Sequence, residues 1–145
     1  MTVQWKIEPL IGLHRILFGM SYHEVVRLCG DPAQQRIIQS TRVARWSDGF
    51  IVHFNPAVEF IEVSRIADVS ATLFGLALLE LLADDVLQCL VEKGHSYEAD
   101  TEDGHLFVFA GLQIGLWRAT KPADEHDQEG RYFDAVGLGR SGYYK

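Results

Sequence analysis

The amino-acid sequence predicts one α+β domain, residues 1–145, in which helices pack on one face of antiparallel sheet. The length is typical of a single domain, and a chain of this size buries about two thirds of the surface that it exposes when unfolded. Apolar residues make up 48% of the chain and charged residues 23%, a balance typical of globular proteins. In addition, two stretches with helical spacing each precede several short stretches with the features of strands.

The first predicted helix begins at a capping box, Ser21-Tyr22-His23-Glu24. In this motif the serine hydroxyl accepts a hydrogen bond from a free backbone N–H, and the glutamate reaches back to the cap. Gly30 and the following Asp31-Pro32 end the helix, because glycine adopts the left-handed conformation and proline cannot continue a helix. The second helix is expected over about 79–93, where apolar residues recur every three or four positions before Gly94.

Eight stretches rich in β-branched and aromatic residues predict strands, four after each helix. Turn signals separate them, among them Ser47-Asp48-Gly49 and Asn55-Pro56-Ala57. The predicted strands cover residues 34–39, 41–46, 50–55, 58–65, 96–100, 105–110, 112–118 and 131–138.

Both halves of the chain therefore repeat the order of a helix, a glycine stop and a four-strand meander. This order predicts pseudo-repeat units of about 18–66 and 75–140, whose third strands align as GFIVHFN from Gly49 and GLQIGLW from Gly111. Two explanations stay open, a tandem duplication and the general frequency of helix-plus-meander units in α+β proteins. In either case we expect the sheet face opposite the helices to be free to bind a partner.

The sequence favours a cytoplasmic location. The two cysteines, Cys29 and Cys89, are too few for a disulfide framework and are expected to be buried and reduced. The N-terminal segment lacks the uninterrupted apolar core of a signal peptide. The most apolar run, 73–82, is far shorter than the roughly 20 residues that cross a bilayer.

Most of the net charge of −7 lies between residues 98 and 129, where eight acidic residues stand against Arg118 and Lys121. A nucleic-acid partner is not expected, since phosphate binding requires clustered basic residues. The acidic cluster either keeps the chain soluble or steers a basic protein partner. Aromatic anchors near it strengthen the second interpretation, although Trp117 also fits a core position. The residues predicted to bind the partner are Asp100, Glu102, Asp103, Trp117, Asp124, Glu125 and Asp127.

No catalytic residue, cofactor or metal is expected from the sequence. The stretch 137–142 reads G-x-G-x-x-G, but no helix N-terminus can follow it before Lys145, so we expect a flexible end of the last strand. None of the six histidines is paired at metal-ligand spacing. Both cysteines lie among Val and Leu residues, where packing is the ordinary role.

Two alternatives to a binding protein remain. A small hydrolase or transferase would bring His53, His105 or Cys29 together with a carboxylate in a pocket that perturbs its pKa. A self-associating structural module would bury a broadly apolar sheet face in a symmetric dimer. The sequence leaves the oligomeric state open.

Residues 18–32, FGMSYHEVVRLCGDP, resemble the opening G-M-S/T-x-x-E-V-x-x-L-x-G-x-P of several families of small bacterial helix-plus-meander proteins. These include β-lactamase inhibitor-like domains, which also carry two such units, outer-membrane assembly lipoproteins, and small proteins encoded beside polymorphic toxins. The second half, with GLWR from Gly115 and FDAVG from Phe133, is similar to bacterial proteins of the immunity type. The resemblance implies a cytoplasmic, non-enzymatic protein that neutralises one cognate toxin. The acidic residues between 98 and 129 indicate that this toxin is a basic protein.

Overall fold

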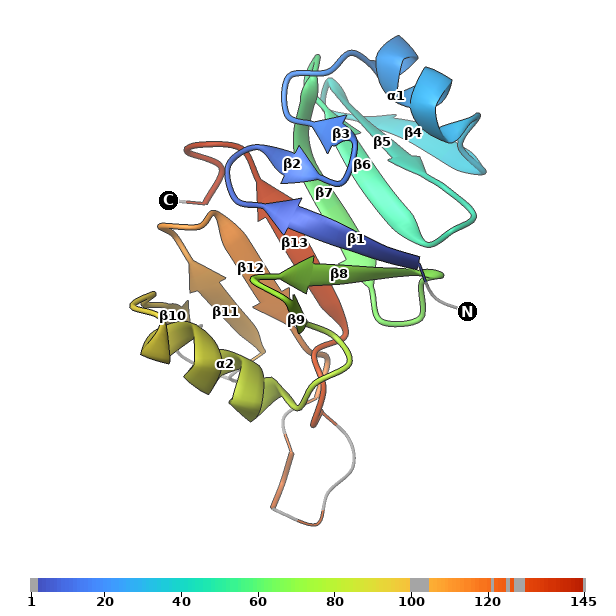
Figure 1. The fold of residues 1–145 in the computed structure, drawn as a ribbon. Helices are drawn as coiled ribbons and strands as arrows, with labels where there is room; N and C mark the ends of the chain where they lie inside the picture. The colour runs from blue at the N-terminus through green and yellow to red at the C-terminus, as the bar shows by residue number, and fades with distance from the viewer. Residues whose placement is uncertain (1–2, 100–104, 121, 125, 127–129, 145) are drawn as a thin grey trace.

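The computed structural model describes residues 3–99, 105–120, 122–124, 126 and 130–144. In this part of the chain, thirteen strands form two sheets, and two short helices accompany them (Figure 1). The larger sheet is antiparallel and has the order β10-β11-β12-β13-β7-β6-β5-β4, and the smaller has the order β3-β2-β1-β8-β9. The elements are β1 (Val3–Glu8), β2 (Gly12–Leu13), β3 (Ile16–Leu17), α1 (Tyr22–Cys29), β4 (Gln34–Ile38), β5 (Thr41–Arg45), β6 (Phe50–Phe54), β7 (Val58–Ser64), β8 (Val69–Leu73), β9 (Leu76–Ala77), α2 (Ala83–Glu92), β10 (Glu98–Ala99), β11 (Leu106–Phe109), β12 (Ile114–Trp117) and β13 (Ala135–Gly139).

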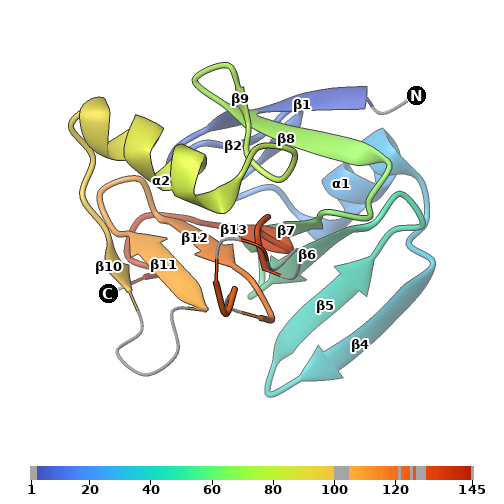
Figure 2. The ribbon, with the colours of Figure 1, turned by 90° about the horizontal axis from the view of Figure 1, so that it is seen from below.

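The predicted α+β class is wrong, because the fold is mostly β and a second sheet forms the middle of the layer that was expected to be helical. Figure 2 shows this smaller sheet lying over the larger one, with α1 and α2 beside it. Its strands β2, β3 and β9 are two residues long, too short for a period-two pattern to show in the sequence. The apolar run 73–82 turns at Phe74 and Gly75, which have φ of 52° and 81°, and α2 begins only at Ala83.

All eight predicted meander strands are present, four after each helix. They form the larger sheet, in which β4 to β7 make one half and β10 to β13 the other. The halves meet where β13 pairs with β7, from Ala135 opposite Ser64 to Gly139 opposite Phe60. The tandem duplication itself stays a prediction.

The capping box of α1 is confirmed. The Ser21 hydroxyl accepts from the Glu24 N–H at 3.1 Å, and the Glu24 carboxylate accepts from the Ser21 N–H at 3.3 Å. At the other end of the helix, the Trp46 indole N–H donates to the Gly30 carbonyl at 2.9 Å, which ties α1 to the residue after β5. Neither described helix has the length and apolarity required to cross a membrane.

The core lies between the two sheets. Strand alternation sends every second side chain of the larger sheet inward, where Val52, Ile61 and Ile114 are fully buried. Phe50 stacks on Trp46 at 5.1 Å and packs against Trp5 of the smaller sheet at the same distance. One face of the larger sheet is thus occupied, and the remaining side chains of these strands form its outer face.

We expect Ser21→Ala to lower the free energy of unfolding by about 1 kcal/mol, because it leaves a helix N–H without its acceptor. Urea denaturation measures the difference. Ser141→Ala, an exposed serine outside the regular elements, is the matched control. An equal effect of both substitutions would contradict the role of the cap.

Candidate functional site

The outer face of the larger sheet has an ordered cross-strand arrangement, because the register of all eight strands is fixed. One row of neighbouring residues crosses the whole sheet, and it is charged at β5, β7 and β10 but has no side chains in the middle. In order from β4, the row consists of Gln34, Arg45, Ile51, Glu62, Gly137, Gly115, Val108 and Glu98.

The last described residues, 140–144, cover the middle of this face and are called the C-terminal strap below. A Cβ at Gly115 would lie 2.6 Å from the Tyr144 hydroxyl oxygen, and one at Gly137 would lie 2.7 Å from the same atom. Tyr143 stacks on Phe60 of β7 with ring centroids 4.6 Å apart. The glycines of the G-x-G-x-x-G stretch therefore make room for two tyrosines, and no helix follows them among the described residues.

Both ends of the C-terminal strap are held in place, so the expected flexible strand end is wrong. Gln113 is 6% exposed; its side-chain nitrogen donates to the carbonyls of Ala110 at 2.8 Å and Tyr144 at 2.9 Å. The Gln113 side-chain oxygen accepts from the Tyr144 N–H at 2.6 Å. At the other end, Arg140 forms an ion pair of 3.8 Å with Glu59, the extra residue of a bulge in β7.

Beside the strap, the outer face over β4 to β7 is hollowed into a groove of about 770 Å³. This volume lies in the range of ligand-binding clefts. Its floor consists of Val43 and Ile51, and charged side chains stand around them. The outer groove, as it is called below, is lined by Gln34, Gln35, Arg36, Ile38, Val43, Arg45, Ile51, His53 and Glu62.

Burial makes Glu62 and His53 of the outer groove less ready to carry charge. Desolvation raises the pKa of Glu62, and the nearby Arg45 opposes that rise. Desolvation also lowers the pKa of His53, which packs edge-on against Phe60, while Glu59 opposes that change. Arg36 and Arg45 are exposed, and their guanidinium groups make no hydrogen bond or ion pair to another described residue. The outer groove is therefore electropositive in a protein whose net charge is −7.

A second hollow, of about 200 Å³, contains Cys29, one of the predicted candidates for catalysis. His14, Arg15 and Asp48 also line it, so the fold places a thiol, an imidazole and a carboxylate around one space. Desolvation and then Asp48 raise the pKa of Cys29, and Arg15 opposes them. The thiol is thus favoured over the thiolate, whereas a nucleophilic cysteine requires the opposite.

The predicted partner-binding residues are only in part described. Asp100, Glu102, Asp103, Glu125 and Asp127 lie outside the described residues. Trp117 is 43% exposed and belongs to the outer face, next to Leu106 and Ala135 on the neighbouring strands. Asp124 lines a cavity of about 240 Å³ with Asp84, Arg118 and Arg131 near the start of α2. The acidic surface stays a prediction.

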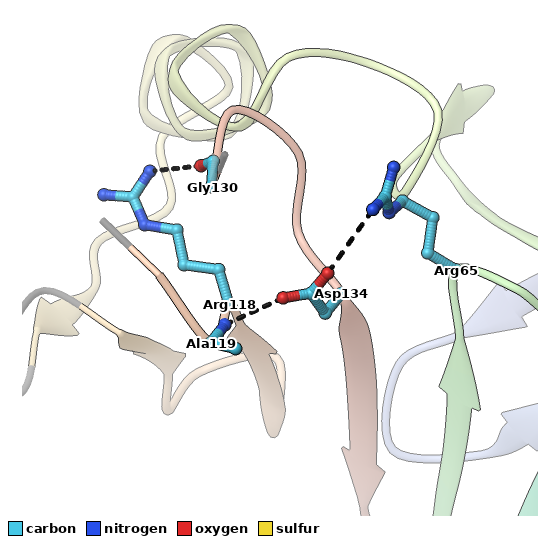
Figure 3. A network of polar contacts seen from close by, with 5 residues as sticks. All are labelled: Arg65, Arg118, Ala119, Gly130 and Asp134. Carbon is cyan, nitrogen blue, oxygen red and sulfur yellow. Dashed lines mark hydrogen bonds and ion pairs between the residues drawn. The ribbon is translucent and has the colours of Figure 1, made fainter. Parts of the chain in front are cut away.

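A network of hydrogen bonds and an ion pair holds the described ends of the segment 119–130 (Figure 3). Asp134 accepts from the Ala119 N–H at 2.7 Å and forms an ion pair of 3.6 Å with Arg65. Arg118 donates to the Gly130 carbonyl at 3.1 Å and lies over the Phe107 ring at 5.4 Å. The network brings the two ends of this segment to adjacent positions beside β12 and β13.

Arg36, Arg45 and Glu62 were not among the residues predicted from the sequence. Arg45 and Glu62 alternate with apolar neighbours in a period-two pattern, which places both on the wetter side of their strands. Arg36 stands in QQRII, which has no such alternation. The pattern does not give the register between strands, and the register decides that Arg45 and Glu62 fall in one row. Within the described residues, no group of three or more His, Cys, Asp and Glu side chains could hold a metal ion.

Comparison with known proteins gives no relative: no protein-family model, no curated protein and no solved structure matches the chain.

We expect Glu62→Gln to stabilise the protein at pH 7. The raised pKa means that the folded state favours the neutral carboxyl, so the stability associated with Glu62 is complete below its ordinary value of 4.5 and is lost as the pH rises through the raised pKa. Glutamine stays neutral throughout. In urea denaturation, the free energy of unfolding of Glu62→Gln should therefore exceed that of the wild type at pH 7, and this difference should become smaller at pH 4. Glu80→Gln, which removes an exposed carboxylate, is the control. An advantage that grows toward pH 4 would contradict the burial argument.

Gln113→Ala should release the C-terminal strap, because it removes all three side-chain hydrogen bonds and leaves the Ala110 carbonyl without this donor. Loss of such buried bonds costs about 1–3 kcal/mol. Hydrogen exchange of the Tyr144 amide should accelerate, while Gln88→Ala, which removes an exposed side-chain bond on α2, should leave it unchanged. Unchanged exchange at Tyr144 in Gln113→Ala would show that the tyrosine rings alone hold the strap.

Proposed function

We propose that this protein is a non-enzymatic, cytoplasmic protein-binding protein of the immunity or inhibitor type, and that its partner docks on the outer groove. The observation that carries the proposal is the combination of an uncovered sheet face with two exposed arginines whose guanidinium groups make no hydrogen bond or ion pair to a described residue. A face of this kind, bounded by a free sheet edge, is typical of binding surfaces rather than of a closed core.

Exposed apolar side chains beside the outer groove support the proposal. Ile37 is 70% exposed and Ile38 is 45% exposed, and both belong to β4, the last strand of the larger sheet. Exposed apolar edge strands promote aggregation, and natural proteins usually cover or shorten them. A partner that covers this edge accounts for the exposure of both isoleucines.

Two surfaces of opposite charge compete as the site of binding. The acidic residues predicted from the sequence favour a basic partner, whereas Arg36 and Arg45 favour carboxylates. Both can serve one partner if it carries a basic surface and an acidic segment. Separate variants of each surface distinguish these arrangements.

The experiment is a comparison of three immobilised proteins in lysate of the source organism at low salt. The wild type is compared with Arg36→Glu/Arg45→Glu and with a variant in which Asp100, Glu102, Asp103, Asp124, Glu125 and Asp127 are neutralised. We expect one protein to be retained by the wild type and lost by the groove variant, because the substitution places like charges against the carboxylates of the partner. Loss only in the acidic variant would move the site to the acidic segments, and retention of nothing by any of the three would contradict the binding function.

A second candidate function, a small hydrolase or transferase, is favoured by one observation. His53 and Glu62, from neighbouring strands, line the same groove, and burial shifts the pKa of both toward the neutral form. A neutral imidazole accepts a proton and a neutral carboxyl donates one, as an acid–base pair requires. This second candidate is tested by mass spectrometry of any ligand that is recovered after binding. A change in the mass of the ligand with the wild type, but not with His53→Asn, would support an enzyme.

A further inference from the structure

The free edge of the larger sheet has main-chain groups available for pairing. β4 and β5 are joined by Gln39 and Ser40, whose φ of 47° and 71° are typical of a two-residue type I′ hairpin turn. In such a hairpin the two residues beside the turn, Ile38 and Thr41, form a hydrogen-bonded pair. Along the two strands, hydrogen-bonded pairs then alternate with non-hydrogen-bonded pairs. The N–H and C=O groups of Gln35 and Ile37 therefore point away from β5, and no described strand lies beyond them.

The side chains along this edge differ between the two faces of the sheet. Gln34, Arg36 and Ile38 lie on the groove side, where Arg45 of β5 is the neighbour of Gln34. Ile37 lies on the opposite side, next to Arg42, which stacks at 4.0 Å on the Tyr22 ring of α1. The edge thus offers the exposed Arg36 on the groove face and the exposed Ile37, beside Arg42, on the other face.

We propose that β4 binds an extended acidic segment of a protein partner, which adds to the larger sheet as a ninth, antiparallel strand. This inference rests on the proposed function and names its mode of recognition. Main-chain hydrogen bonds to Gln35 and Ile37 supply affinity, and the alternating side chains supply specificity. Residues of the segment that face the groove place carboxylates beside Arg36, and the residues between them place apolar side chains beside Ile37.

The charge at the edge selects this occupant over a second copy of the chain. An antiparallel pair of β4 strands that uses both sets of free groups sets Gln35 opposite Ile37 of the other copy. In that register the two Arg36 side chains face each other directly, and like charges in this position are destabilising. A segment with carboxylates in the same position removes that repulsion.

The probe is a capped peptide of sequence Thr-Val-Glu-Val-Glu-Val-Thr, titrated into the full-length protein with detection by NMR of the Gln35 and Ile37 amides. We expect these amide signals to shift on binding. A peptide with lysine in place of glutamate should bind at least about tenfold more weakly, because it reverses the charge beside Arg36. Equal binding of both peptides would overturn the acidic specificity.

Backbone methylation of the peptide tests the ninth strand directly. In an antiparallel pairing, the residues opposite Gln35 and Ile37 are the valines, so their N–H groups point at β4. N-methylation of the valines should abolish binding, whereas N-methylation of the glutamates, whose N–H groups point to solvent, should leave it unchanged. Equal binding of the two methylated peptides would overturn strand addition, whatever the state of the protein.

Two substitutions in the protein complete the test. Ile37→Pro removes the free N–H while leaving the pairing to β5, so it should abolish peptide binding without a change in the circular dichroism spectrum. Arg36→Glu should weaken binding about tenfold, and Lys93→Glu, the same charge change at the end of α2, should not. If Ile37→Pro unfolds the hairpin, the methylated peptides still decide the question.

The outcomes separate this inference from the proposed function. If the natural partner is retained in a groove-dependent manner but the acidic peptide does not bind, the protein binds a partner and the ninth strand is wrong. If neither binds, both proposals fall. Self-association of the wild type that Ile37→Pro abolishes, measured by analytical ultracentrifugation, would assign the edge to a second copy instead.

Discussion

The antiparallel pairing of β13 with β7 is the constraint on which the rest of the structure depends. It joins two meanders that are distant in sequence into one eight-stranded sheet, with Gly137 opposite Glu62 and Gly139 opposite Phe60. Because side chains alternate along a strand, this register fixes what meets on each face. A shift of one residue would turn either Val63 or Val136, both fully buried, toward solvent. The core and the outer face are thus two results of one register.

The glycines of β12 and β13 divide the outer face into a filled part and an open part. Over Gly115 and Gly137 the absence of side chains makes room for the ring of Tyr144, and Gln113 fixes its backbone. Burial and the neighbouring Tyr143 and Glu62 raise the pKa of Tyr144, which therefore stays neutral. Beyond the part of β7 that the C-terminal strap contacts, the strands toward β4 carry side chains, and the outer groove lies over them. The same face is closed at its centre and open toward the free edge.

Much of the larger sheet could be predicted from the sequence, and little of the site could. The capping box at Ser21 and the alternation in β6 are local signals, and both the helix and the strand are where they predict. The smaller sheet has no comparable signal, because β2, β3 and β9 are two residues long and β1 pairs in parallel with β8 across more than sixty residues of chain. The covering layer was therefore assigned to helices, which was wrong. The acidic residues drew attention as a cluster, while Arg36 and Arg45 stand apart in the sequence and were missed.

The sequence by itself determined that two helices form, where the eight strands of the larger sheet lie, and which side chains of β6 alternate between the core and the outer face. Capping, turn chemistry and alternation act over a few residues and can therefore be recognised locally. Only the tertiary structure decided how the strands pair, since pairing depends on contacts between residues far apart in the chain. It set Arg45 and Glu62 in one row, placed Tyr144 over the glycines, and left β4 at a free edge. The electropositive groove in an acidic protein is a product of that pairing.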